Sequence, residues 1–204
     1  MGGWRSQGGT RTQDARRFSI TLDRKNAKWA YARGEPFRSI AALEAVGILL
    51  GVILLTVPGD NIRPCGGMAK IRGFTDNRGN QFALTKLMST KWPLTAIIME
   101  LSEQLCQRRM MLGVEWIPRD QNEEADALTN DDFSLFSPER RIDVKLEEIK
   151  FAVLEGLLEE SEKFHTEIKQ RKEEGAGREK AHERKGPRDR AGTKRRKLRY
   201  REPW

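Results

Sequence analysis

Cysteine is nearly absent from this sequence of 204 residues. Cys65 and Cys106 lie far apart and belong to no CxxC motif, so the sequence supports neither a disulfide framework nor a zinc site. The amino terminus also lacks the apolar segment of a secretory signal peptide, which argues against export. We therefore expect an intracellular protein, either nuclear or cytoplasmic.

A long hydrophobic run is absent as well. The longest candidate, residues 45–57, has 13 residues without a charge, whereas a helix needs about 20 apolar residues to cross a bilayer. Extending the run back to Ser39 adds only one charged residue, Glu44. We interpret this stretch as the buried helix of a soluble core and expect no membrane partner, with a membrane segment as the alternative.

Basic residues, in contrast, are abundant, and their excess lies at one end of the chain. The sequence has 38 Lys and Arg against 30 Asp and Glu. Residues 169–204 contain 15 of the former and 6 of the latter, so they carry the whole net positive charge. From Gly175 onward there is almost nothing to bury, and we expect residues 175–204 to be a disordered tail. Its run Lys194, Arg195, Arg196 and Lys197 is typical of phosphate-binding segments and of nuclear-import signals.

Strand and helix signals alternate over the first half of the chain. Apolar and polar residues alternate over Phe18–Leu22 as in a half-buried strand, and Asp23–Asn26 follows as a turn. A helix is predicted from about Arg38 or Ser39 to Thr56, where Pro58-Gly59 ends it. A short strand is predicted over Met68–Thr75, followed by a helix over about Gly79–Met88.

The second half continues with a helix that begins near Pro93 and is broken by Gly113. Its apolar face is formed by Leu94, Ile97, Ile98, Leu101 and Leu105. A strand over Val114–Ile117 follows, and then a helix that Asp120 is expected to cap together with Glu123 and that Asn130 closes.

Residues 132–174 form an extension with a different sequence pattern, that of a long amphipathic helix. A long amphipathic helix is predicted from about Asp143 to Glu174, with a regular apolar stripe. That stripe needs a partner, which is either the body of the domain, a coiled-coil strand or a neighbouring domain. Packing on the body is the favoured alternative.

Three acidic residues occur where a charge is usually costly. Glu44 interrupts an apolar helix, Asp76 ends a predicted strand, and Asp126 lies in a helix one turn after Asn122. Buried carboxylates are normally paired or bound to metal. Taken singly, each acid also fits an ordinary structural role at a helix rim, in a turn or on an exposed helix.

The motifs around these acids occur in a recognisable order: Pro36-Phe-Arg-Ser-Ile-Ala-Ala-Leu-Glu44, Phe74-Thr-Asp-Asn77, Ala83-Leu-Thr-Lys86, Met99-Glu-Leu101, and Glu115-Trp-Ile-Pro-Arg119 through Ala125-Asp-Ala-Leu-Thr-Asn130. In this order they resemble the ribonuclease H domain of reverse transcriptase polyproteins from tyrosine-recombinase (DIRS-like) retrotransposons. The resemblance covers residues 1–131 and extends to Asp132–Pro138. It implies an α/β fold with a ribonuclease H-like mixed sheet and flanking helices.

The resemblance also implies a chemistry. Glu44, Asp76 and Asp126 match three of the family's four catalytic acids, which hold two Mg²⁺ ions, and Asn122 supports the last of them. Two ions about 3.5–4 Å apart activate a water and stabilise the leaving oxygen of phosphodiester cleavage. The implied substrate is the RNA strand of an RNA–DNA hybrid, the implied partner is an upstream reverse transcriptase domain, and the three carboxylates are expected to converge.

The sequence departs from the family at its beginning. Gly2-Gly3-Trp4 aligns with the family's second strand, so the first strand, which lies in the middle of the sheet and carries the fourth acid, would precede Met1. The family's loop histidine is also missing, because His165 and His182 both follow Asp126. We therefore expect an interrupted sheet, marginal stability and incomplete catalysis.

Two alternatives remain open at this point. The chain is either a disabled ribonuclease H fragment or a non-catalytic nucleic-acid-binding protein that uses its basic tail. The start Met1-Gly2-Gly3 also fits the loose pattern of an N-myristoylation signal, although the alignment makes these glycines interior strand residues.

Overall fold

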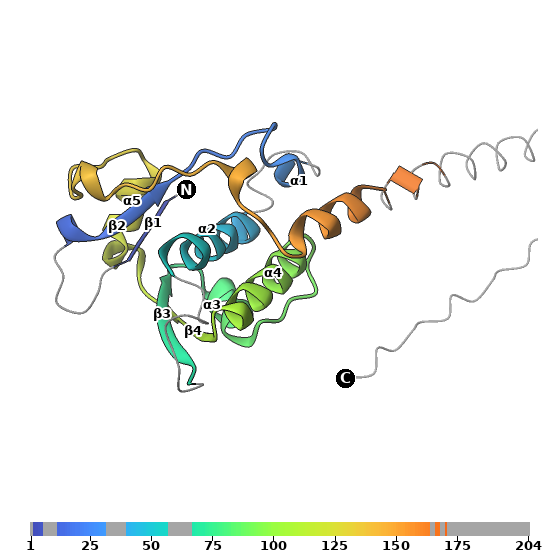
Figure 1. The fold of residues 1–204 in the computed structure, drawn as a ribbon, viewed down its shortest axis with the longest axis horizontal. Helices are drawn as coiled ribbons and strands as arrows, with labels where there is room; N and C mark the ends of the chain where they lie inside the picture. Colours follow the sequence, from blue (N-terminus) through green and yellow to red (C-terminus); the bar gives the residue numbers. More distant parts are fainter. Residues whose placement is uncertain are drawn as a thin grey trace, which may run out of the picture. The chain divides into compact units, whose positions relative to one another are not determined.

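The computed structural model describes residues 2–5, 12–31, 40–56, 67–163, 166–167 and 170. The chain divides into two compact units, residues 1–161 and residues 162–204. All described strands lie in the first unit, where they combine with helices into a mixed α/β structure (Figure 1). The expected α/β class is therefore confirmed. The basic run from Lys194 to Lys197, and the tail around it, lie outside the described residues.

The first sheet is an antiparallel pair of β1 (Gly2–Arg5) and β2 (Arg16–Ser19), with Gly2 opposite Ser19 and Arg5 opposite Arg16. The short 3₁₀ turn η1 (Thr12–Asp14) precedes β2. The strand predicted over Phe18–Leu22 is therefore wrong by two to three residues. The described ladder with β1 runs from Arg16 to Ser19 and sets these bounds.

The turn after β2 forms where the sequence predicts it. Asp23 Oδ1 accepts hydrogen bonds from the backbone N–H groups of Lys25 (2.7 Å) and Asn26 (2.9 Å). This is the side-chain-to-backbone bonding that makes Asp and Asn common in turns. The one-turn helix α1 (Lys28–Tyr31) follows directly.

The two glycines of β1 are required by packing. A Cβ atom on Gly2 would lie 2.6 Å from Cβ of Leu128 in α5 (Glu123–Thr129), and one on Gly3 would lie 2.8 Å from the ring of Phe18. Both distances are below van der Waals contact, so only glycine allows α5 and β2 to approach β1 this closely. This packing favours the interior-strand interpretation of the glycines.

The second sheet is a parallel pair. β3 (Ala69–Thr75) and β4 (Met110–Trp116) pair in register over their whole length. The predicted break at Gly113 is wrong, because α4 (Leu94–Gln107) ends earlier and Gly113 lies inside β4. The chain reverses at Arg109, which has a φ of 50°. The apolar residues that precede Gly113 then pair with residues of β3 in the parallel ladder.

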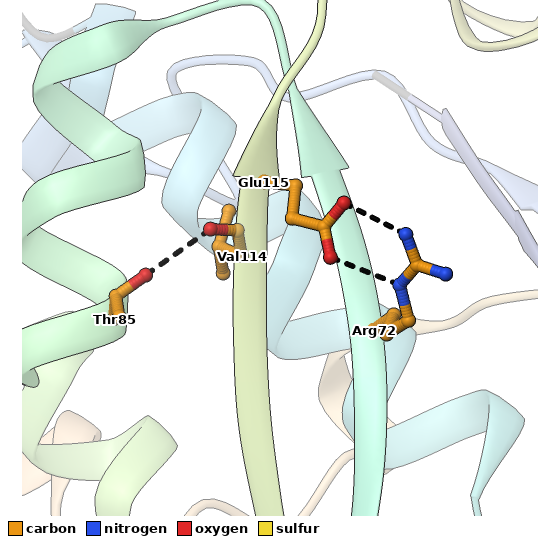
Figure 2. Close-up of polar contacts among 4 residues, drawn as sticks. All are labelled: Arg72, Thr85, Val114 and Glu115. Atoms are coloured by element: carbon orange, nitrogen blue, oxygen red, sulfur yellow. Dashed lines mark hydrogen bonds and ion pairs between the residues drawn. The ribbon is translucent and has the colours of Figure 1, made fainter.

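The outer strand of each sheet also accepts a hydrogen bond from a neighbouring segment. Thr85 of α3 (Arg78–Lys86) donates its hydroxyl to the carbonyl oxygen of Val114 at the edge of β4, at 3.2 Å (Figure 2). At the edge of β2, the N–H of Ile142 donates to the carbonyl oxygen of Arg17 at 2.8 Å. Among the described residues the strands form two separate two-stranded sheets, β1–β2 and β3–β4.

Helix α2 (Ile40–Leu55) forms the centre of the core and confirms the predicted buried helix. It packs against β1, α3 and α4. Its buried residues are Ala42, Ala45, Val46, Leu49, Leu50, Val52 and Leu55. Within the described ranges, no helix combines the length and the apolar character that a membrane crossing requires.

The extension after residue 131 differs from its prediction. The single helix expected over Asp143–Glu174 is wrong in its first part, where only the 3₁₀ turn η6 (Leu146–Glu148) forms and the helical residues begin at 154. A second 3₁₀ turn, η5 (Pro138–Arg140), lies upstream. The apolar side chains of this segment pack on the core, as favoured over a coiled coil: Ile142, Val144, Leu146, Ile149, Phe151 and Leu154.

A buried carboxylate explains where that last helix begins. Glu100 on α4 is fully buried and accepts hydrogen bonds from the backbone N–H groups of Ala152 (3.0 Å), Val153 (2.7 Å) and Leu154 (3.0 Å). Burial raises the pKa of Glu100, but these bonds and one from Gln104 outweigh it and leave the pKa below its usual value. The carboxylate thus caps the helix from outside the segment, a tertiary interaction that periodicity cannot reveal.

Replacing Glu100 with alanine should destabilise the protein by about 3 kcal/mol or more, because three buried N–H groups lose a charged acceptor. The matched control is Glu103→Ala on the same helix, whose carboxylate accepts only from the exposed Gln107. Since the folded-state pKa of Glu100 is lowered, its stabilisation is complete above the unfolded-state pKa and is lost as pH falls through the folded value. Urea unfolding of both variants measures the difference, and equal losses would contradict this role.

Candidate functional site

The carboxyl end of β3 is built around a capped helix. Asn77 follows Asp76 directly, and its Oδ1 accepts hydrogen bonds from the N–H groups of Gly79 (3.0 Å) and Asn80 (3.2 Å). The N–H of Asn77 in turn donates to Oγ1 of Thr75 at 3.2 Å. Asp76 is therefore held between the last residue of a strand and the N-cap of α3, which fixes its backbone.

Glu44 reaches this end of β3 from α2. Its Oε2 accepts a hydrogen bond from Nδ2 of Asn80 at 2.8 Å, and the same nitrogen donates to the carbonyl oxygen of Ala41 at 2.9 Å. Asn80 is fully buried, and within the described structure its Oδ1 has no hydrogen-bond partner. The buried Asn80 side chain thus links α3 to α2 by hydrogen bonds and orients the Glu44 carboxylate.

Glu44 and Asp76 form an electrostatically coupled pair. Burial is the largest cause that raises the pKa of Glu44, and the negative charge of Asp76 raises it further. Hydrogen bonds from Asn77 and Asn80 act in the opposite direction, yet the pKa remains above its usual value. A carboxyl group whose pKa is raised by burial and by a neighbouring carboxylate is a common feature of functional sites.

The end of β4 fixes the backbone of Asp76 from the other side. The indole Nε1 of Trp116 donates to the carbonyl oxygen of Asp76 at 2.9 Å. The guanidinium of Arg78 stacks on the same indole, with its Cζ 4.3 Å from the ring centroid. Sequence reasoning missed the roles of Asn80, Arg78 and Trp116, although the polar run after the strand-end aspartate was a signal for the first two.

Asp126 has a different environment. It lies on α5, which packs against β1 and β2, and its Oδ2 pairs with Nε of Arg119 at 3.3 Å. Asn122 occupies the N-cap position of α5, but its side chain makes no capping hydrogen bond. The predicted cap by Asp120 is wrong, because the 3₁₀ turn η4 (Arg119–Gln121) takes up this residue and the helix starts only at Glu123.

Two of the three predicted acids, Glu44 and Asp76, interact electrostatically. Glu44 and Asp76 are neighbours, whereas the carboxylate of Asp126 is engaged by Arg119. Among the described residues, no group of three or more His, Cys, Asp or Glu side chains is arranged to hold a metal ion. The joint site of all three acids, with Asn122 in support, stays a prediction.

The carboxylates of Glu44 and Asp76 are oxygen donors of the kind that a magnesium ion would need. Magnesium prefers hard oxygen ligands and is usually held by one or two carboxylates together with water and substrate phosphates. A cation between the two carboxylates would also relieve the repulsion that contributes to the raised pKa of Glu44. A second ion would need further oxygen donors.

No family model, curated protein or solved structure matches this chain. Its functional interpretation therefore rests on the order of its motifs and on the geometry at the end of β3.

The coupling between the two acids can be measured by titration. Asp76→Asn should lower the pKa of Glu44, because it removes the neighbouring charge that contributes to its rise. Asp126→Asn is the matched control and should leave that pKa unchanged. Because the folded-state pKa is raised, ionised Glu44 destabilises the fold, and stability should fall as pH rises through that value. Carbon-13 NMR of the Glu44 carboxyl group reports the shift, and an unchanged value in Asp76→Asn would contradict the pairing.

Proposed function

We propose that this chain is a ribonuclease H-like domain of a retroelement reverse transcriptase. In its complete form such a domain hydrolyses the RNA strand of an RNA–DNA hybrid with two bound Mg²⁺ ions. The observation that carries the proposal is the coupled pair of Glu44 and Asp76, one from the central helix and one from the end of a parallel strand. The ordered motifs from Pro36 to Asn130 support it.

In this proposal the residues around the pair act as positioning groups. Asn80 orients the carboxylate of Glu44, and Trp116 together with the Asn77 cap fixes the backbone of Asp76. A magnesium ion held there would activate a water and stabilise charge on a phosphate oxygen. The raised pKa of Glu44 means that binding a cation releases a proton from part of the population, so metal affinity should increase with pH.

The proposed cleavage requires a further strand and a further carboxylate beyond those of the described residues. A strand between β1 and β3, carrying an aspartate, would join the two sheets and add a third carboxylate beside Asp76. It would also tie α5, which packs on β1 and carries Asp126, to the end of β3. In the complete protein we propose that an upstream segment next to a reverse transcriptase domain supplies this strand, and that the chain by itself is inactive.

The cleavage experiment compares two proteins. The first is this chain, and the second is the same chain with an aspartate-bearing strand attached to its amino terminus through a flexible linker. Only the second should cleave the RNA strand of a labelled hybrid duplex in the presence of Mg²⁺, and Asp76→Asn should abolish that cleavage. Circular dichroism confirms that each variant is folded. The proposal fails if the folded, strand-bearing protein leaves the hybrid intact, or if its cleavage survives Asp76→Asn.

A second candidate function, non-catalytic nucleic-acid binding, is favoured by one observation. Residues 169–204 carry the whole excess of positive charge, and their composition offers no surface that could select a base sequence. Such a segment binds phosphates by releasing counterions, without sequence preference.

The tail is tested by comparing the full chain with a chain that ends at Gln170. Each phosphate contact should contribute about 0.7 to the log-log slope of affinity against salt for a single strand. The full chain should therefore bind single-stranded RNA more tightly and with a steeper salt dependence. Equal affinity of the two proteins at low salt would exclude the tail as a binding element.

A further inference from the structure

One face of the β3–β4 pair carries no helix among the described residues. Parallel strands are normally covered on both faces, and α2, α3 and α4 gather on one side of this pair (Figure 1). The other side, termed here the outer face, presents alternate side chains: Lys70, Arg72 and Phe74 from β3, and Met111 and Glu115 from β4. Phe74 is 51% exposed and Met111 is 55% exposed. The exposed ring of Phe74 is accessible for stacking on a planar ligand.

The ion pair of Arg72 and Glu115 lies at the centre of the outer face. The guanidinium of Arg72 donates from Nε (2.9 Å) and Nη2 (2.7 Å) to the two carboxylate oxygens of Glu115 across the strands. Figure 2 shows this pair standing clear of the strands, with α2 behind them. The Cζ atom of Arg72 also lies 5.5 Å from the centroid of the Phe74 ring. The planar guanidinium and the ring are thus held next to each other before any ligand binds.

Glycine gives the outer face its shape. Gly113 pairs with Arg72 in the ladder, and a Cβ atom at Gly113 would lie 3.2 Å from Cε of Lys70. The aliphatic part of the Lys70 side chain therefore lies over Gly113 of β4, which has no side chain in its way. This contact places an ammonium group beside the Arg72–Phe74 unit.

The chemistry of the outer face fits one class of ligand. Bases stack on aromatic rings and on guanidinium planes, while lysine contacts phosphate. Residues two apart on a strand lie roughly 6.6 Å apart, so Lys70, Arg72 and Phe74 form a line of cation, plane and ring. The centre of a protein interface is usually depleted of charge, whereas this small face carries three charged side chains. A duplex would keep its bases stacked within itself.

We propose that the outer face of β3 and β4 binds single-stranded nucleic acid, with bases stacked on Phe74 and Arg72 and a phosphate at Lys70. The residues that form this surface belong neither to the basic tail nor to the Glu44–Asp76 pair. Glu115 acts as a positioning residue, because its two hydrogen bonds fix the orientation of the Arg72 guanidinium.

The test uses the full chain and a short fluorescein-labelled oligouridylate. Phe74→Ala should raise the Kd about tenfold, in line with the loss of one stacked base. The matched control is Phe82→Ala, because Phe82 is also an exposed phenylalanine, 62% accessible, but lies on α3. Anisotropy is measured at raised salt, where the electrostatic contribution of the tail is reduced. Equal effects of the two substitutions, or none, would overturn the proposal.

Photo-cross-linking gives a second readout that needs no substitution. An oligonucleotide containing 5-iodouridine should cross-link to the peptide that includes Phe74, and mass spectrometry identifies the position. Cross-links confined to residues 169–204, or to elements other than β3 and β4, would contradict the assignment. Failure of the hybrid-cleavage experiment alone would leave both of these results intact.

Discussion

The packing of α2 holds the described fold together. β1 and β3 share no ladder among the described residues, so side-chain contacts must do what hydrogen bonds do in a continuous sheet. α2 contacts β1 on one side and α3 and α4 on the other. Truncating one of its buried leucines, such as Leu49, should cost about 2–5 kcal/mol, a large part of the roughly 5–15 kcal/mol that stabilises an ordinary domain. The position of Glu44 therefore depends on the same contacts that hold the two sheets in one body.

Buried polar groups decide where the flanking segments attach to this core. Asn80 joins α3 to α2 through Ala41 and Glu44, and Glu100 joins the segment that starts at Ala152 to α4. Each group is fully buried, so losing its partners leaves a desolvation penalty that water cannot relieve. Both interactions link residues that are far apart in the sequence. The hydrogen bonds of Asn80 that join α3 to α2 therefore also position Glu44 at the candidate site.

The sequence was sufficient for elements whose periodicity is strong. The buried helix over residues 40–55, the strand that ends before Asp76 and the helix after it were all predictable from apolar spacing and from Asn77. The errors lie where tertiary contacts override local signals. Gly113 was predicted to break a helix, but it lies in β4, which pairs with β3. The helix predicted to begin at Asp143 begins later, where Glu100 accepts hydrogen bonds from the backbone N–H groups of its first residues. For the site, Glu44 and Asp76 were predicted from the sequence, whereas the Arg119 pairing of Asp126 depends on a turn that no periodicity encodes.

We propose that Glu44 and Asp76 together hold a divalent metal ion. Manganese is a suitable probe, because it shares the preference of magnesium for carboxylate oxygens and its free ion gives an electron paramagnetic resonance signal that binding reduces. Titrating the folded chain with manganese should reveal a site that both Glu44→Gln and Asp76→Asn weaken strongly, whereas Glu103→Gln, on the exposed side of α4, has no effect. Manganese binding that is the same in all four proteins would contradict the account.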